Sequence, residues 1–130
     1  MFLMSPIKKI NKKIKREKSF TKLYEELSNS IRSPILRKIK RIGRFFPREN
    51  GLVQMEVEDL SIRDLVYLKK EKEKIENLTQ KISEEMNKEA SGKGAIAIQL
   101  KEKLLGEWML ARQILKELRE IEKEIEKKLK

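Results

Sequence analysis

Apolar side chains recur at intervals of three and four residues along most of the chain, which is the spacing of one face of a helix. In the first such stretch a narrow stripe of isoleucines widens, from Phe20 onward, into a face broad enough to line a core. Ser5-Pro6 is a start signal, because serine caps the first backbone amides and proline fits the first turn without losing a hydrogen bond. We therefore expect a helix from about Pro6 that is kinked or capped anew at Ser19, with its apolar face over residues 20–31 buried.

Ser33-Pro34 repeats this start signal and predicts a second helix that ends at Phe46, just before a proline. On this helix the isoleucines and Phe46 share one side, and three arginines share the opposite side. The three are Arg37, Arg41 and Arg44. No acid lies between Arg32 and Arg48, so i,i+4 ion pairs cannot form within the segment. Because the planar guanidinium binds phosphate through two hydrogen bonds, we interpret the arginine row as a phosphate-binding surface rather than a solvated face.

Two longer helices are predicted after residue 60. The first, over residues 61–90, begins at a capping box formed by Ser61 and Asp64, and its apolar seam is interrupted by Lys72 and Thr79. The second, over residues 95–130, has a similar seam with a polar interruption at Glu122. The Gly-Lys-Gly between them lacks the flanking residues of a phosphate-binding loop, so we take it as a turn. At 1.5 Å per residue the helices measure about 45 and about 54 Å, so an antiparallel pair leaves an overhang for another element to cover.

Residues 53–57 alternate apolar and polar side chains, which is the period of a strand. A single strand is not stable alone, so this stretch is either an extended connector over the helices or an edge that pairs with another copy, and we favour the connector. The predicted fold is all-α, with a basic N-terminal helical arm followed by a long antiparallel helical hairpin or bundle. Its predicted divisions are the arm at residues 1–48, the extended connector at residues 49–60 and the hairpin or bundle domain at residues 61–130.

Positive charge is concentrated at one end of the chain. Residues 1–48 hold 15 Lys and Arg against 3 Glu, whereas residues 49–130 hold 17 Lys and Arg against 18 Asp and Glu, and the whole chain carries a net charge of +11. Such a segregated field attracts polyanions, although a basic tail that only keeps the chain soluble has the same composition. The candidate nucleic-acid-binding residues are Lys8, Lys9, Lys12, Lys13, Lys15, Arg16, Lys18, Lys22, Arg32, Arg37, Lys38, Lys40, Arg41, Arg44 and Arg48.

The composition excludes most kinds of catalytic and metal site. The chain has no Cys and no His, which removes thiolate nucleophiles, zinc sites and the side chain best suited to proton transfer near neutral pH. Aspartate occurs only at Asp59 and Asp64, and the glutamates are interleaved with lysines, so no acid pair stands out for general acid and base catalysis. We expect no enzymatic activity, no cofactor and no metal. The abundance of Lys, Glu and Ile is typical of thermophile proteins.

The sequence shows no export or membrane-spanning segment. The apolar stretch at residues 1–4 is far shorter than the ~7–15 residues of a signal-peptide core, and no run reaches the ~18–20 apolar residues of a membrane span. We therefore expect a protein that is neither secreted nor transmembrane, associated with nucleic acid inside the cell or in a virion. The start of the helix predicted at residues 34–46 carries Pro-Ile-Leu instead of Asn, Gln or Arg, which argues against sequence-specific recognition by that helix.

These features favour a sequence-independent nucleic-acid-binding and packaging protein. Duplex DNA is favoured over RNA, because the aromatic residues that would stack on bases fall at or beside predicted buried faces. With its roughly 130 residues, a basic arm over residues 8–48 and helices over residues 61–130, the chain resembles the major capsid proteins of archaeal filamentous double-stranded DNA viruses. The resemblance covers the whole chain and lies in its architecture. It implies that the arm wraps linear duplex DNA, and that like or paralogous subunits associate through the helices of residues 61–130 into a helical virion.

Two other functions stay open at this point. One is an RNA-binding helical subunit of a ribosomal or CRISPR ribonucleoprotein particle, because charge alone does not separate RNA from DNA. The other is a membrane-surface or coiled-coil adaptor, in which apolar residues near the N-terminus insert at an anionic bilayer. We favour neither, since the isoleucine stripe is narrow for an interfacial helix and the single tryptophan, Trp108, lies in the other half of the chain.

Overall fold

The computed structural model describes residues 6–46, 54–88 and 97–129, of which residues 6–14 and 128–129 are described as backbone only. The elements are α1 (Pro6–Ile31), α2 (Pro34–Lys38), α3 (Lys40–Gly43), the 3-10 turn η1 (Val57–Asp59), α4 (Ile62–Lys88) and α5 (Ile98–Leu129). No strand is present among these residues, and the all-α prediction is confirmed.

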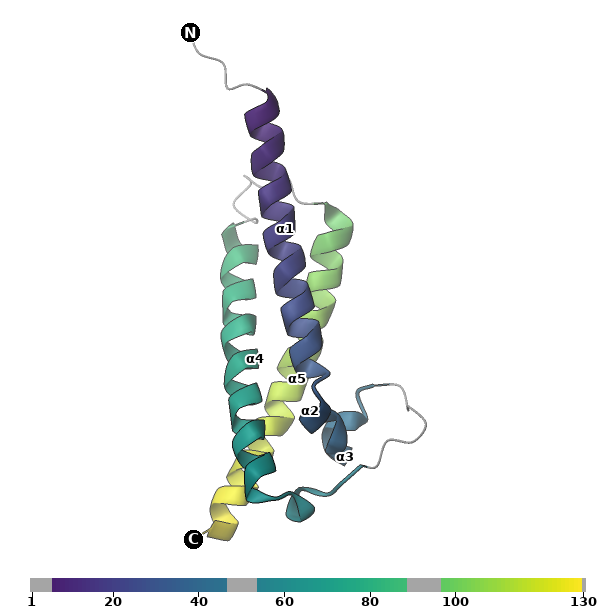
Figure 1. Cartoon of the computed structure of the whole chain (residues 1–130), viewed down its shortest axis with the longest axis vertical. Coiled ribbons are helices and arrows are strands. Elements are labelled where there is room, and N and C mark those ends of the chain that lie inside the picture. Colours follow the sequence, from purple (N-terminus) through teal and green to yellow (C-terminus); the bar gives the residue numbers. More distant parts are fainter. Residues whose placement is uncertain (1–5, 47–53, 89–96, 130) are drawn as a thin grey trace.

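The long helices α1, α4 and α5 form a bundle, in which each packs against the other two (Figure 1). The predicted antiparallel pairing of α4 and α5 is confirmed, and α1 fills the groove between them. The short helices α2 and α3 lie at the end of α1, where α2 contacts α4 and α3 contacts α5. Besides α4, the longer C-terminal helix therefore has α1 and α3 as partners, which the sequence pattern does not specify. No helix in the described part of the chain is long and apolar enough to cross a bilayer.

Helix α1 is continuous, so the kink or new cap predicted at Ser19 is wrong. Ser19 lies exposed on the helix surface, where its hydroxyl has no need to interrupt the backbone hydrogen bonds. The predicted buried face is confirmed, because Phe20, Leu23, Leu27 and Ile31 are all at most 4% exposed.

The single helix predicted over residues 34–46 is wrong, because the chain leaves the helical conformation at Ile39. Ile39 is extended, and it forms an isolated parallel bridge with Met55 of the connector. Lys40 N donates to the Met55 carbonyl at 3.1 Å, and Met55 N donates to the Lys38 carbonyl at 2.5 Å. These bonds satisfy backbone groups that the interrupted helix leaves unpaired, so the break costs little.

The bridge shows where the described part of the predicted connector lies. Met55 pairs with Ile39 of the same molecule. Val57 then begins a single 3-10 turn and is buried with Leu60 in the core. The rest of the predicted connector, residues 49–53, lies outside the described residues.

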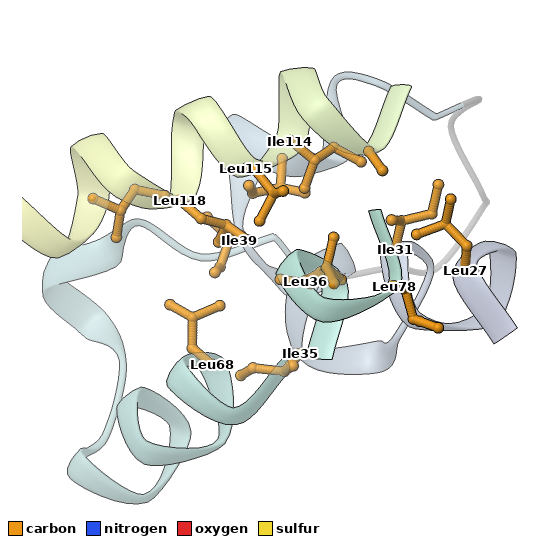
Figure 2. Close-up of a cluster of buried hydrophobic side chains, with 14 of the residues drawn as sticks. Leu27, Ile31, Ile35, Leu36, Ile39, Leu68, Leu78, Ile114, Leu115 and Leu118 are labelled. Atoms are coloured by element: carbon orange, nitrogen blue, oxygen red, sulfur yellow. The ribbon is translucent and has the colours of Figure 1, made fainter. Parts of the chain in front are cut away.

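One hydrophobic core runs through all these elements. Figure 2 shows Leu36 and Ile39 among side chains of α4, such as Leu68, and side chains of α5, such as Leu115. Leu36, Ile39 and Ile42 have no exposed surface. Residues 20–42 thus share one core with residues 57–121, and the predicted division between an arm at residues 1–48 and a bundle at residues 61–130 does not separate two packing units.

The polar interruptions of the two predicted seams contact one another or the opposite helix. Lys72 of α4 forms an ion pair with Glu122 of α5 and a second one with Glu76 at 3.3 Å. Trp108 of α5 donates its Nε1–H to the carbonyl of Thr79 of α4 at 3.0 Å. The Lys72–Glu122 pair therefore joins the two polar interruptions across the helices, whereas Thr79 contacts α5 through its backbone and its hydroxyl donates to the Glu76 carbonyl within α4. The capping box is also confirmed, since Asp64 N donates to the Ser61 hydroxyl at 3.1 Å.

Replacing Gly106 with alanine should raise the free energy of unfolding by about 0.5–1 kcal/mol. Gly106 lies exposed inside α5, and an added Cβ would meet no atom within 4 Å. The glycine therefore weakens the helix without relieving a close approach inside the molecule. Urea unfolding followed by circular dichroism measures the change, and an unchanged or lower free energy would contradict the geometry of α5 given above.

Candidate nucleic-acid interface

Three of the candidate nucleic-acid-binding arginines, two of them from the predicted phosphate-binding surface, bind acids of α5. Arg32 forms a forked pair with Glu107, with Nη1 and Nη2 donating to the two carboxylate oxygens at 2.7 and 3.2 Å. Arg44 Nη2 donates to Glu117 at 2.6 Å. The acids come from a helix more than 70 positions away in sequence, so the absence of acids near the arginines did not leave them unpaired.

Arg41 is the centre of the largest ion-pair cluster. Its Nη1 donates to both carboxylate oxygens of Glu124 at 2.9 Å. Its Nε donates to Glu117 at 3.3 Å, and its Nη2 donates to Glu120 at 3.4 Å. Spacings of three and four residues place these acids along one side of α5. Every nitrogen of this guanidinium therefore has a carboxylate partner within the chain.

Two of the acids in these pairs are largely buried, whereas Glu120, Glu124 and Arg44 are about half exposed or more. The side chains of Glu107 and Glu117 are only 13% and 16% exposed. The hydrogen bond to Glu107 raises the pKa of Arg32 above its ordinary value, against the effect of burial. Burial alone would lower the pKa of Arg41, but the bonds and charges of Glu124 and Glu117 raise it. Both arginines thus stay charged with their donors occupied, and a phosphate would have to displace a carboxylate to bind them.

The faces of two guanidinium groups are occupied as well. Arg32 lies over the ring of Phe46 at 5.1 Å from its centroid, and Arg44 lies over Phe45 at 5.0 Å. Both phenylalanines are half-buried against the core. These contacts hold the end of the segment that follows α3 against the bundle.

The other candidate cations near α2 and α3 form fewer contacts within the chain. Arg37 is half-buried and has contacts within the molecule, and Lys38 is exposed. Lys40 is exposed and lies 3.7 Å from Glu56. Arg48 lies outside the described residues. The predicted arginine row is therefore not a free cationic surface, because its best-placed members are used inside the fold.

The candidates on α1 have a different setting. Lys15, Lys18 and Lys22 are exposed, and Arg16 is half-buried with contacts of its own. Figure 1 shows the first turns of α1 extending beyond the ends of α4 and α5. The remaining four candidates lie on that extension as helical backbone, and their side chains are outside the described residues. They are Lys8, Lys9, Lys12 and Lys13.

The sequence analysis missed a second set of exposed cations, on the outer side of α5. They are Arg112, Lys116, Arg119 and Lys123. The mixture of lysine and glutamate near the C-terminal end of this helix favours i,i+4 pairs within the helix. In the structure Glu117, Glu120 and Glu124 pair with Arg41 or Arg44 instead, and the four cations have no ion-pair partner within the described part of the chain. The signal was present in the sequence as basic residues at spacings of 4, 3 and 4.

The described residues hold no cluster of three or more side chains suited to a metal ion. Comparisons with known proteins give no identification. No family model, curated protein or solved structure matches the chain. The function is therefore argued from the geometry of the chain itself.

Replacing Arg41 with methionine should lower the free energy of unfolding by about 1–3 kcal/mol, because the change leaves a half-buried cluster of carboxylates without its central cation. Arg63→Met is the matched control, since Arg63 is exposed at the start of α4 and has no ion pair with any residue that the structure describes. We expect less than about 0.5 kcal/mol for the control. Equal effects of the two changes in urea unfolding would show that the cluster does not stabilise the fold.

Proposed function

We propose that this protein binds nucleic acid without recognising its sequence, and that the N-terminal half of α1 makes the principal contact. The observation that carries the proposal is the extension of α1 beyond the bundle (Figure 1). Residues 6–16 of that helix include six Lys or Arg and no acid. A basic helix that stands clear of a folded body can approach a polyanion without unfolding anything else.

The distribution of charge supports this assignment. The three arginines that pair with α5 add their charge to an acidic surface, whereas Lys15, Lys18 and Lys22 are exposed. Phosphate contacts gain free energy by releasing counterions, and this gain requires cations that are not already neutralised. Of the candidates over residues 8–48, those at residues 8–22 are therefore the proposed contact, and the paired arginines at residues 32–44 are not part of it.

Coating of duplex DNA is the form of this function that we favour. A net charge of +11 neutralises on the order of 5–6 base pairs per chain, since duplex DNA carries one charge per ~1.7 Å. That ratio suits a protein that covers DNA along its length, as a capsid or nucleocapsid subunit does. The proposed role is non-enzymatic, and its setting is a virion or another nucleoprotein particle.

We also propose that copies of the chain associate through α5. Ile98, Leu105 and Met109 are exposed by 71%, 44% and 54%, and they lie within about 40° of one another around the helix. Leu105→Glu with Met109→Glu should therefore abolish self-association while leaving the monomer folded. Sedimentation velocity measures the association, with Lys69→Glu and Lys70→Glu on α4 as controls. A wild-type chain that stays monomeric at high concentration would contradict this part of the proposal.

The experiment that tests the proposed function compares three polyanions. Random double-stranded DNA, random single-stranded RNA and anionic liposomes are titrated with the full chain by fluorescence anisotropy or flotation at several salt concentrations. We expect duplex DNA to bind most tightly, regardless of its sequence, with an affinity that falls as salt rises. A preference for RNA would assign the chain to a ribonucleoprotein instead, and binding to liposomes alone would assign it to a membrane surface.

A further inference from the structure

The paired acids and the unpaired cations of α5 lie on different sides of the helix. Its acids at positions 107, 117, 120 and 124 face the arginines of residues 32–44. Its four exposed cations lie within about 60° of one another around the helix. These cations are Arg112, Lys116, Arg119 and Lys123. Because the acids are used elsewhere, this outer stripe keeps its positive charge.

Two of these cations line a hollow between α4 and α5. Arg112 and Arg119 form its rim on α5, and Gln80 and Ser83 form its rim on α4. The hollow measures about 240 Å³ and is open to solvent. No residue of α1, α2 or α3 lines the hollow, so it is separate from the nucleic-acid contact proposed on α1. It is smaller than the roughly 300–1,000 Å³ of pockets that enclose drug-sized ligands, which fits a small polar group better than a whole cofactor.

Two side chains of the hollow, Trp108 and Arg112, are held in place by contacts within the chain. Trp108 is fixed by the hydrogen bond from its Nε1–H to the Thr79 carbonyl, 3.0 Å long. Arg112 lies over the ring of Trp108, with its guanidinium carbon 5.0 Å from the centroid. Stacking leaves the edge of the guanidinium free, and this edge carries the donors that bind an anion. A stacked arginine also loses less conformational entropy on binding than a free one.

Two acids lie close to the hollow, and both have partners within the fold. Glu122, one turn from Arg119, forms an ion pair with Lys72 of α4. Glu84 on α4 accepts a hydrogen bond at 3.4 Å from the amide of Gln80, a residue of the hollow, whose second N–H is left for a ligand. No residue at i±3 or i±4 from Arg112 is acidic. Two guanidinium groups, a hydroxyl and an amide therefore share one hollow in which no carboxylate forms part of the lining.

We propose that this hollow binds a phosphate ester through Arg112 and Arg119, with Ser83 and Gln80 as further donors. Guanidinium groups match phosphate oxygens in both geometry and charge, and they do so better than lysine. We take the phosphate to belong to a nucleic-acid backbone, and this part of the inference rests on the proposed function. It deepens that function, because a second contact on α4 and α5 would hold the bundle, and not α1 alone, against the polyanion.

Trp108 reports binding directly, since it is the single tryptophan and lies under Arg112. The full chain is titrated with sodium tripolyphosphate, and with sodium chloride at matched ionic strength, while tryptophan emission is recorded. We expect a saturable change with tripolyphosphate alone. Arg112→Gln with Arg119→Gln should weaken it at least about tenfold, and the lysine pair R112K with R119K should weaken it less. The control removes two charges elsewhere, as Lys70→Gln with Lys103→Gln, and should leave the response unchanged.

The outcomes separate this site from the proposed function. No saturable response, or equal responses of the glutamine variant and the wild type, overturns the site even if the chain binds DNA. A normal response in a chain that binds no nucleic acid supports a phosphate site and overturns the proposed function. Calorimetry with a nucleoside monophosphate and with duplex DNA identifies the source of the phosphate. Saturable binding of the free nucleotide points to a small ligand. Tight binding of DNA alone points to the phosphates of a nucleic-acid backbone.

Discussion

Replacing five lysines of α1 with glutamine, at positions 8, 9, 12, 13 and 15, should weaken the affinity for duplex DNA at least about 100-fold at near-physiological salt. These positions lie on the part of α1 that extends beyond the bundle, so their removal takes charge from the proposed contact. Each phosphate contact contributes about 0.9 to the slope of log affinity against log salt, so the loss of five contacts should flatten the slope by about 4.5. Glutamine favours helices nearly as well as lysine, so we expect α1 to persist.

The matched control removes the same charge from the bundle. Lys69, Lys70, Lys74, Lys81 and Lys103 are exposed and have no ion pair in the described part of the chain. Their replacement by glutamine should lower the affinity for duplex DNA much less than the change in α1 does, because it alters only the net charge of the protein. Anisotropy titrations of a random-sequence duplex compare the two variants with the wild type. Equal losses in both variants would mean that binding follows net charge, and that α1 has no special role.

Replacing Leu36 with alanine should lower the free energy of unfolding by about 2–5 kcal/mol. Leu36 lies in the short helix α2, has no exposed surface and belongs to the core shared by α1, α4 and α5 (Figure 2). Its truncation leaves a cavity between helices whose backbones are held by other contacts, so the core closes over it only in part. A loss of this size is a large share of the roughly 5–15 kcal/mol by which a domain is usually stable.

Leu105→Ala is the control for this change, because Leu105 is 44% exposed on α5. We expect less than about 0.5 kcal/mol for it, measured by urea unfolding at concentrations where the chain is monomeric. Similar effects of the two substitutions would show that residues 34–43 do not pack into the bundle. They would then belong to a separate arm, as the charge distribution alone had indicated.

Features governed by neighbouring residues could be predicted from the sequence. The buried face from Phe20 to Ile31, the capping box at Ser61 and the two long C-terminal helices all depend on patterns that repeat within a few residues. The exposed lysines at positions 15, 18 and 22 follow from the same periodicity. These predictions needed no knowledge of the tertiary arrangement.

Features governed by distant residues were beyond such patterns. The break at Ile39 depends on hydrogen bonds with Met55, and the binding of Arg41 depends on acids of α5 that lie 76 to 83 positions away. No acid lies near these arginines in the sequence, so local spacing alone predicts free cations that could bind phosphate. Charges that are segregated along a sequence can meet in the fold, and here that pairing decides which cations stay available.

The central claim is that the exposed cations of α1, and not the paired arginines, carry the binding of duplex DNA. The salt dependence of DNA affinity in an Arg41→Met and Arg44→Met variant tests it most directly, at a temperature where circular dichroism shows the variant to be folded. If the two arginines serve the fold, the slope of log affinity against log salt should stay within about 1 of the wild-type value. A slope flatter by about 2 would mean that both arginines release counterions on binding, and would contradict the claim.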